Sequence, residues 1–137
     1  MVLLAGLTFA GNPVNAEDWP QFRGPERNGK SAEKGIIKSW ERSAPKLLWM
    51  GEGMGNGYAA PAVVGERIYS CGDLKDGQGV VALNAKDGKT VWSTTITEGA
   101  PKHGYEGSRC TPTVVGGKLW VTTSDGVIAC LTTDGKI

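Results

Sequence analysis

The chain has 137 residues and a formal net charge of +1, with 15 basic and 14 acidic side chains. This balance provides no basic surface for nucleic acid or anionic membrane, so we expect no nucleic-acid partner. The 21 glycines are about twice the usual share, and the frequent turns they allow predict a protein of many short strands.

Residues 1–16 are predicted to be a signal peptide. An apolar run from Val2 to Ala10 is followed by the small residues Val14-Asn15-Ala16, where a signal peptidase would cleave. The run is too short to span a bilayer, so we expect no membrane span and an exported protein, periplasmic or on the cell surface. No basic residue precedes Arg23, which leaves a truncated signal peptide or a disordered apolar tail as alternatives.

Residues 17–44 are rich in proline, glycine and charge, and they predict an extended N-terminal arm with a short helix or turn near 32–40. Three aromatic residues would dock this arm on a larger body: Trp19, Phe22 and Trp40. The arm includes G-P-E-R-N-G-K-S at 24–31, which satisfies the P-loop pattern for binding phosphates. No apolar strand precedes this motif, so we favour a solvated turn over a nucleotide site.

Residues 45–137 contain one pattern twice. The first copy reads A-P-A-V-V-G-E-R-I-Y and then G-V-V-A-L-N-A-K-D-G, and the second reads T-P-T-V-V-G-G-K-L-W and then G-V-I-A-C-L-T-T-D-G. The corresponding prolines, Pro61 and Pro112, lie about 50 residues apart, a period typical of propeller or solenoid units. The full copy predicts four short antiparallel strands with tight glycine turns, the unit of a β-propeller blade. These strands are expected at 61–64, 67–71, 79–83 and 89–94.

The predicted fold is therefore all-β, with about two four-stranded antiparallel blades. We expect three parts: a strand at 45–49, a full blade at 58–94 and a partial blade at 107–137. The second copy stops before the position that corresponds to Trp92, and a ring needs about four to eight blades. We therefore expect the first partner of these blades to be further blades of the same chain. The alternative is a short protein that oligomerises to complete a ring.

The stretch 82–92 reads A-L-N-A-K-D-G-K-T-V-W and resembles the repeat A-x-D-x-x-T-G-x-x-x-W of the PQQ-like, quinoprotein alcohol dehydrogenase-like β-propellers. The opening D-W-P-Q-F-R-G-P is similar to the N-termini of exported bacterial propellers of this type. The resemblance implies that tryptophans dock on glycines between adjacent blades. The implied dock residues are Trp49, Ala82, Gly88, Trp92, Ala129 and Gly135.

The resemblance implies two alternative functions. Non-catalytic propellers of this family scaffold other proteins, so we expect an exported module that binds an envelope protein or a small ligand. The alternative is the N-terminal part of a PQQ-dependent alcohol dehydrogenase, which would bind PQQ and Ca²⁺. Such enzymes carry an adjacent Cys-Cys pair and an acidic Ca²⁺ cluster that do not appear here, so no catalytic residue, metal ligand or cofactor is predicted within these residues.

Two loops form the candidate site, because the loops that enter the innermost strands of a propeller line one mouth of its channel. These loops are residues 50–58 and 98–109, and the binding residues predicted on them are Tyr58, His103, Tyr105, Glu106 and Arg109. His103 could act as an acid or base near neutral pH. The competing interpretation is a solvated loop in which Arg109 caps a backbone carbonyl.

The chain has three cysteines, so at least one is unpaired in an exported protein. Cys130 occupies the place of Leu83 in the other copy and is expected to be a small buried hydrophobe. Cys71 and Cys110 could meet across neighbouring repeats.

Overall fold

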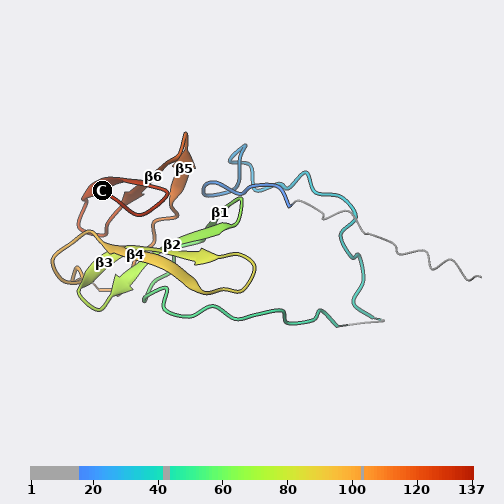
Figure 1. The fold of residues 1–137 in the computed structure, drawn as a ribbon, viewed down its shortest axis with the longest axis horizontal. Helices are drawn as coiled ribbons and strands as arrows, with labels where there is room; N and C mark the ends of the chain where they lie inside the picture. The colour runs from blue at the N-terminus through green and yellow to red at the C-terminus, as the bar shows by residue number, and fades with distance from the viewer. Residues whose placement is uncertain (1–15, 42–43, 103) are drawn as a thin grey trace, which may run out of the picture.

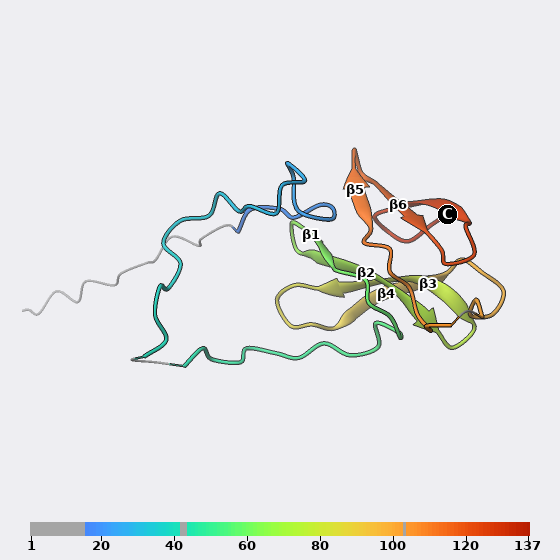
Figure 2. The ribbon, with the colours of Figure 1, turned by 180° about the vertical axis from the view of Figure 1, so that it is seen from behind.

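The computed structural model describes residues 16–41, 44–102 and 104–137, and within these ranges it contains strands and loops but no helix. The strands form two antiparallel sheets, one of four strands and one of three, that lie beside each other without closing a ring (Figures 1 and 2). The prediction of an all-β, incomplete propeller is confirmed. The predicted signal peptide falls almost entirely outside the described residues, and none of the described residues forms a helix long and apolar enough to cross a membrane.

The first sheet follows the order of the chain. Its strands are β1 (Ala62–Val64), β2 (Arg67–Leu74), β3 (Gly77–Asn84) and β4 (Thr90–Thr95). Each strand pairs with the next, and a two-residue turn at 65–66 brings the last residue of β1 opposite the first of β2. β3 lies between β2 and β4 and is buried along nearly its whole length, which explains its apolar residues on both faces.

The second sheet has three strands among the described residues. They are β5 (Thr113–Val115), β6 (Lys118–Thr122) and β7 (Ile128–Thr132), again paired in chain order. Burial alternates along β6, with Leu119 and Val121 buried and Trp120 44 % exposed on the other face. This alternation is typical of a sheet with one packed face.

The two sheets share one hydrophobic core. Four buried residues come from β2 and β3 and four from β6 and β7: Tyr69, Cys71, Val80, Ala82, Leu119, Val121, Ala129 and Leu131. Burying one valine or leucine side chain stabilises the folded state by about 1.5–3 kcal/mol. The packing of the sheets on each other therefore supplies the main apolar contact between the two repeats.

The N-terminal arm joins both sheets at their β1 and β5 edges. Trp19 and Val63 exchange two backbone hydrogen bonds of 2.7 and 2.9 Å, and the Pro20 carbonyl accepts from the Val114 N–H at 2.8 Å. The arm thereby satisfies backbone groups that an open strand edge would expose to water. Trp19 is half-buried and its ring lies against Gly24 of the arm, whereas Phe22 and Trp40 are 63 % and 55 % exposed.

The structure differs from the sequence-based expectation at residues 45–49. Residues 45–49, predicted as a strand, belong to neither sheet and to none of the isolated bridges of the described residues. An extended segment becomes a strand only when a neighbouring strand accepts and donates its hydrogen bonds, and no described strand pairs with this one. Residues 32–40, for which the sequence predicts a short helix or turn, form bends and no helix. The motif at 24–31 consists of turns and bends, in line with the favoured interpretation, and lacks the following helix that a P-loop needs.

Candidate functional site

The two candidate loops meet at the end of the first sheet where β2 leads into β3. Gly57 forms a parallel bridge with Ser108, whose carbonyl accepts from the Tyr58 N–H at 2.7 Å. Asn56 and Asp73 exchange two further backbone hydrogen bonds of 2.8 and 3.0 Å. The loops are therefore bound to each other and to β2, rather than independent of the sheet.

The carboxylate of Asp73 fixes the second loop. Its Oδ2 accepts from the Gly107 N–H at 2.8 Å, and its Oδ1 accepts from Nε2 of Gln78 at 2.6 Å. Gly107 has a φ of +93°, and an added β-carbon there would come within 2.7 Å of the Asn56 carbonyl oxygen. The close approach of the two loops therefore requires glycine at this position.

The guanidinium of Arg109 lies between two exposed tyrosine rings. Its Cζ is 5.7 Å from the ring centre of Tyr58 and 6.0 Å from that of Tyr105, and the two residues are 74 % and 75 % exposed. Such cation–π contacts are worth about 0.5–1 kcal/mol each at an exposed site. Arg109 also donates to the carbonyls of Tyr105, at 3.0 Å, and Gly107, at 3.3 Å. It therefore caps backbone carbonyls and orients the two rings at the same time.

A hollow of about 580 Å³ adjoins these rings. It is lined by Gly55, Asn56, Gly57, Tyr58, Gly104, Tyr105 and Glu106. A neighbouring hollow of about 350 Å³ shares Asn56 and Glu106 with it and adds Asp73 and Lys102. The structure thus brings Tyr58, Tyr105, Glu106 and Arg109 to one surface, while His103 lies outside the described residues.

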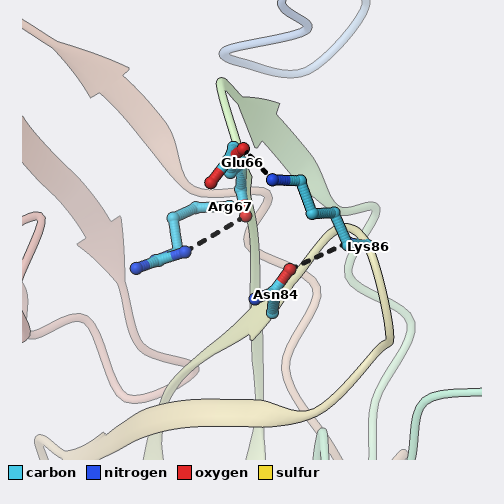
Figure 3. A network of polar contacts seen from close by, with 4 residues as sticks. All are labelled: Glu66, Arg67, Asn84 and Lys86. Carbon is cyan, nitrogen blue, oxygen red and sulfur yellow. Dashed lines mark hydrogen bonds and ion pairs between the residues drawn. The ribbon is translucent and has the colours of Figure 1, made fainter.

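A different polar network occupies the opposite end of the first sheet, where β2 begins and β3 ends (Figure 3). Nζ of Lys86 forms an ion pair with the Glu66 carboxylate, and the Lys86 N–H donates to Oδ1 of Asn84 at 2.8 Å. The hydrogen bond from Lys86 lowers the pKa of Glu66. Nη1 of Arg67 donates to the Glu66 carbonyl at 3.3 Å. This network lies at the other end of the strands from the candidate loops, so its residues can serve as controls in experiments on the loops.

Gln78 is a central residue of the site that sequence reasoning missed. It is 1 % exposed, and its amide holds Ser124 in the β6–β7 turn: Oε1 accepts from the Ser124 N–H at 2.6 Å and Nε2 donates to Oγ at 3.1 Å. The same Nε2 donates to Asp73, so the amide links the candidate loops to the second sheet. Asp73 and Gln78 belong to no motif, and the sequence indicates only an ordinary loop there.

The tryptophans expected to dock between blades lie on glycines. A β-carbon added to Gly88 would collide with the ring of Trp49, and one added to Gly135 would lie 2.7 Å from Cδ2 of Trp92. Nε1 of Trp92 also donates to the Thr133 carbonyl at 3.0 Å. Each ring therefore occupies space that only a glycine leaves open.

The two alanines of the expected dock lie in the shared core. Ala82 is fully buried and stands between Tyr69 on β2 and Trp92 on β4 in the strand register. Its small side chain leaves room for those two rings, whose centres are 6.0 Å apart. Ala129 is 7 % exposed in the same core. The two alanines thus lie in the core that the sheets share, and neither lines the hollow.

Two antiparallel sheets pack on one core, and each contains or is followed by a glycine turn on which a tryptophan from the preceding part of the chain lies. This arrangement defines a repeat protein built of propeller-type blades. A family model described as outer membrane protein assembly factor BamB matches residues 31–137. The chain belongs to this family of PQQ-like repeat proteins. A search of curated proteins gave no match.

Proposed function

We propose that this chain is the partner-binding part of an exported PQQ-like propeller and that Tyr58, Tyr105 and Arg109 contact a protein partner. The observation that carries this proposal is the Arg109 guanidinium between two tyrosines that are 74 % and 75 % exposed. Tyrosine and arginine are enriched among the residues that dominate the binding energy of protein interfaces. Rings already oriented by Arg109 lose little conformational freedom when a partner binds.

The lining of the hollow supports a protein segment over a small molecule. Small-molecule sites are mostly apolar and enclose their ligand. This hollow is instead lined by glycine backbone, Asn56 and Glu106 beside the two tyrosines. A polar surface with two aromatic anchors suits a partner that offers apolar side chains to the rings and polar groups to Glu106 and Arg109.

An envelope location is part of the proposal. The family description names an assembly factor of outer membrane proteins, which supports a scaffolding role for this chain among envelope proteins. The apolar run from Val2 to Ala10 supports export.

The described residues do not fit the cofactors of the alternative, a PQQ-dependent dehydrogenase. Among them no group of three or more His, Cys, Asp or Glu side chains could hold a metal ion, and no two cysteines are adjacent in the sequence. Dye-linked alcohol oxidation by the full-length protein with added PQQ and Ca²⁺ tests that alternative directly. Quinone-dependent turnover would replace the scaffolding proposal, and its absence is the expected result.

Site-specific photo-cross-linking in the native cells tests the binding surface. A photoreactive residue at position 58 or 105 of the full-length protein should give the same cross-linked envelope protein. Arg109→Ala should reduce the yield about tenfold, because its loss frees both rings and the loop. The control, Arg67→Ala, removes a half-buried arginine that also donates to a backbone carbonyl, at the other end of the sheet. A photoreactive residue at position 86, in the polar network at the other end of the sheet, is the second control. Equal cross-linking from that position, or no effect of Arg109→Ala, would contradict the proposal.

A further inference from the structure

Two cysteines from different repeats lie in contact inside the molecule. Cys71 is in β2, 5 % exposed, and belongs to the shared core, while Cys110 lies just before β5 and packs against that core. The side chains of Cys71 and Cys110 interact directly, and both thiols are free in the structure. The contact therefore crosses from the first repeat to the second.

The two thiols differ in accessibility and acidity. Cys110 lines a hollow of about 320 Å³ with Arg109 and residues 122–124, whereas Cys71 is buried. The interaction with Cys71 lowers the pKa of Cys110, and so does the hydrogen bond of 3.2 Å that its sulfur accepts from the Thr122 N–H, whereas burial opposes them. The same contact with Cys110, together with burial, raises the pKa of Cys71. Cys110 is thus the accessible nucleophile, and Cys71 is the thiol that would resolve an intermediate.

The third cysteine is separated from this pair by the strand register. Cys130 lies directly opposite Trp120 on β6, so both side chains are on the same face of the second sheet. Leu119 and Val121, the neighbours of Trp120, are on the other face and belong to the core with Cys71. Cys130 therefore faces away from the pair.

We propose that Cys71 and Cys110 form a reversible disulfide that joins the two repeats, with a small-molecule disulfide such as oxidised glutathione as the oxidant. The Cys110 thiolate attacks one sulfur of the oxidant, forms a mixed disulfide and releases one glutathione thiolate. Cys71 then attacks the Cys110 sulfur and releases the second glutathione, and the protons of the two thiols leave with the two departing thiolates. The two cysteine sulfurs are oxidised to one disulfide, and the oxidant is reduced to two thiols.

The bond would act on the candidate binding surface. Cys110 directly follows Arg109, whose guanidinium lies between the two exposed tyrosines. A disulfide to β2 would anchor the end of this loop to the buried core. It would also close a covalent loop between the repeats, which restricts the unfolded chain and stabilises the folded one.

Peptide mapping of the full-length protein tests the proposal without any substitution. Trypsin places the three cysteines in separate peptides, 68–75, 110–118 and 119–136. Protein reduced and then incubated with oxidised glutathione should lose two hydrogens in mass and yield peptide 68–75 linked to 110–118. Reduction with dithiothreitol should release both peptides, and oxidation should raise the unfolding temperature by about 5 °C or more.

Two outcomes would overturn the proposal: a linked peptide that contains Cys130, or glutathione that remains on Cys110 in the wild-type protein. Two variants test which cysteines form the bond. Cys130→Ser should form the linked peptide as the wild type does, because it leaves both partners in place. Cys71→Ala should accumulate the mixed disulfide on Cys110, since no second thiol can resolve it.

Discussion

The indole of Trp92 lies on the backbone of Gly135, 43 residues further along the chain. Nε1 of the ring donates to the Thr133 carbonyl at 3.0 Å, and the nearby Thr94 hydroxyl donates to the Gly135 carbonyl at 2.7 Å. These contacts connect β4 of the first sheet with the turn that follows β7 of the second. The last strand of one repeat is thereby fastened to the end of the next.

Substitution at Gly135 should weaken this contact. Gly135→Ala places a β-carbon 2.7 Å from the Trp92 ring and forces alanine into a φ of +84°, so the free energy of unfolding should fall by about 2–4 kcal/mol. Gly126→Ala is the matched control, because Gly126 has a similar φ of +91° with nothing within 4 Å of the added carbon. Its free energy of unfolding should fall by only about 1–2 kcal/mol, from backbone strain alone. Equal losses in urea denaturation would show that the ring contact contributes nothing.

Removal of the Gln78 amide should weaken the contact between the two sheets at the end where the candidate loops lie. Gln78→Leu keeps the buried volume but leaves the Ser124 N–H and Asp73 Oδ1 without their partner, which should cost about 2–4 kcal/mol in the free energy of unfolding. Ser124→Ala removes only the 3.1 Å contact to Oγ and keeps the N–H bond to Oε1, so it should cost about 1 kcal/mol or less. A Gln78→Leu variant as stable as wild type in chemical denaturation would refute this role.

The Arg109 side chain should protect its own loop from proteolysis. Arg109→Ala removes the hydrogen bonds to the Tyr105 and Gly107 carbonyls. Local opening should become about 1–2 kcal/mol easier, so chymotrypsin should cleave after Tyr105 about 5–30 times faster. Arg67→Ala, at the far end of the sheet, should leave that rate unchanged. The measurement is the rate of appearance of the fragment that begins at residue 106, and similar rates in all three proteins would contradict the expectation.

The reactivity of Cys110 should depend on pH through its contact with Cys71. The groups around its sulfur are the Cys71 thiol from β2, the Thr122 N–H from β6 and Arg109 in the same hollow. Because the pKa of Cys110 is lowered, the thiolate persists to lower pH than in an ordinary cysteine, whose pKa is about 8.5. Its alkylation by iodoacetamide in a Cys130→Ser background should therefore reach half its maximal rate below about pH 8.5.

Cys71→Ala removes the thiol that lowers the pKa of Cys110 and should move this midpoint upward, towards the ordinary value. Circular dichroism of the variant checks that the fold survives the substitution. A midpoint that stays the same in folded Cys71→Ala protein would show that the thiol contact does not set the acidity of Cys110.

The strand positions could be predicted because their signals are local. The turns at 65–66 and 116–117 contain glycines with positive φ, and they define the β1–β2 and β5–β6 hairpins. β2 and β3 are longer than expected, since they continue to Leu74 and from Gly77 where the predicted strands end at 71 and begin at 79. The added residues include Asp73 and Gln78, whose polar side chains suggest a loop but are paired across it in the structure.

The amino-acid sequence by itself determined the all-β class, the repeat and the family, because short-range patterns of glycine, proline and apolar residues encode turns and strands. It also marked the two loops that carry Tyr58, Tyr105 and Arg109. Only the tertiary structure decided that these three side chains meet, that Gln78 joins the sheets, and that Cys71 lies against Cys110. Except for the contact of Tyr105 with Arg109, these contacts join residues far apart in the chain, which come together because two sheets must bury one apolar face each against the other.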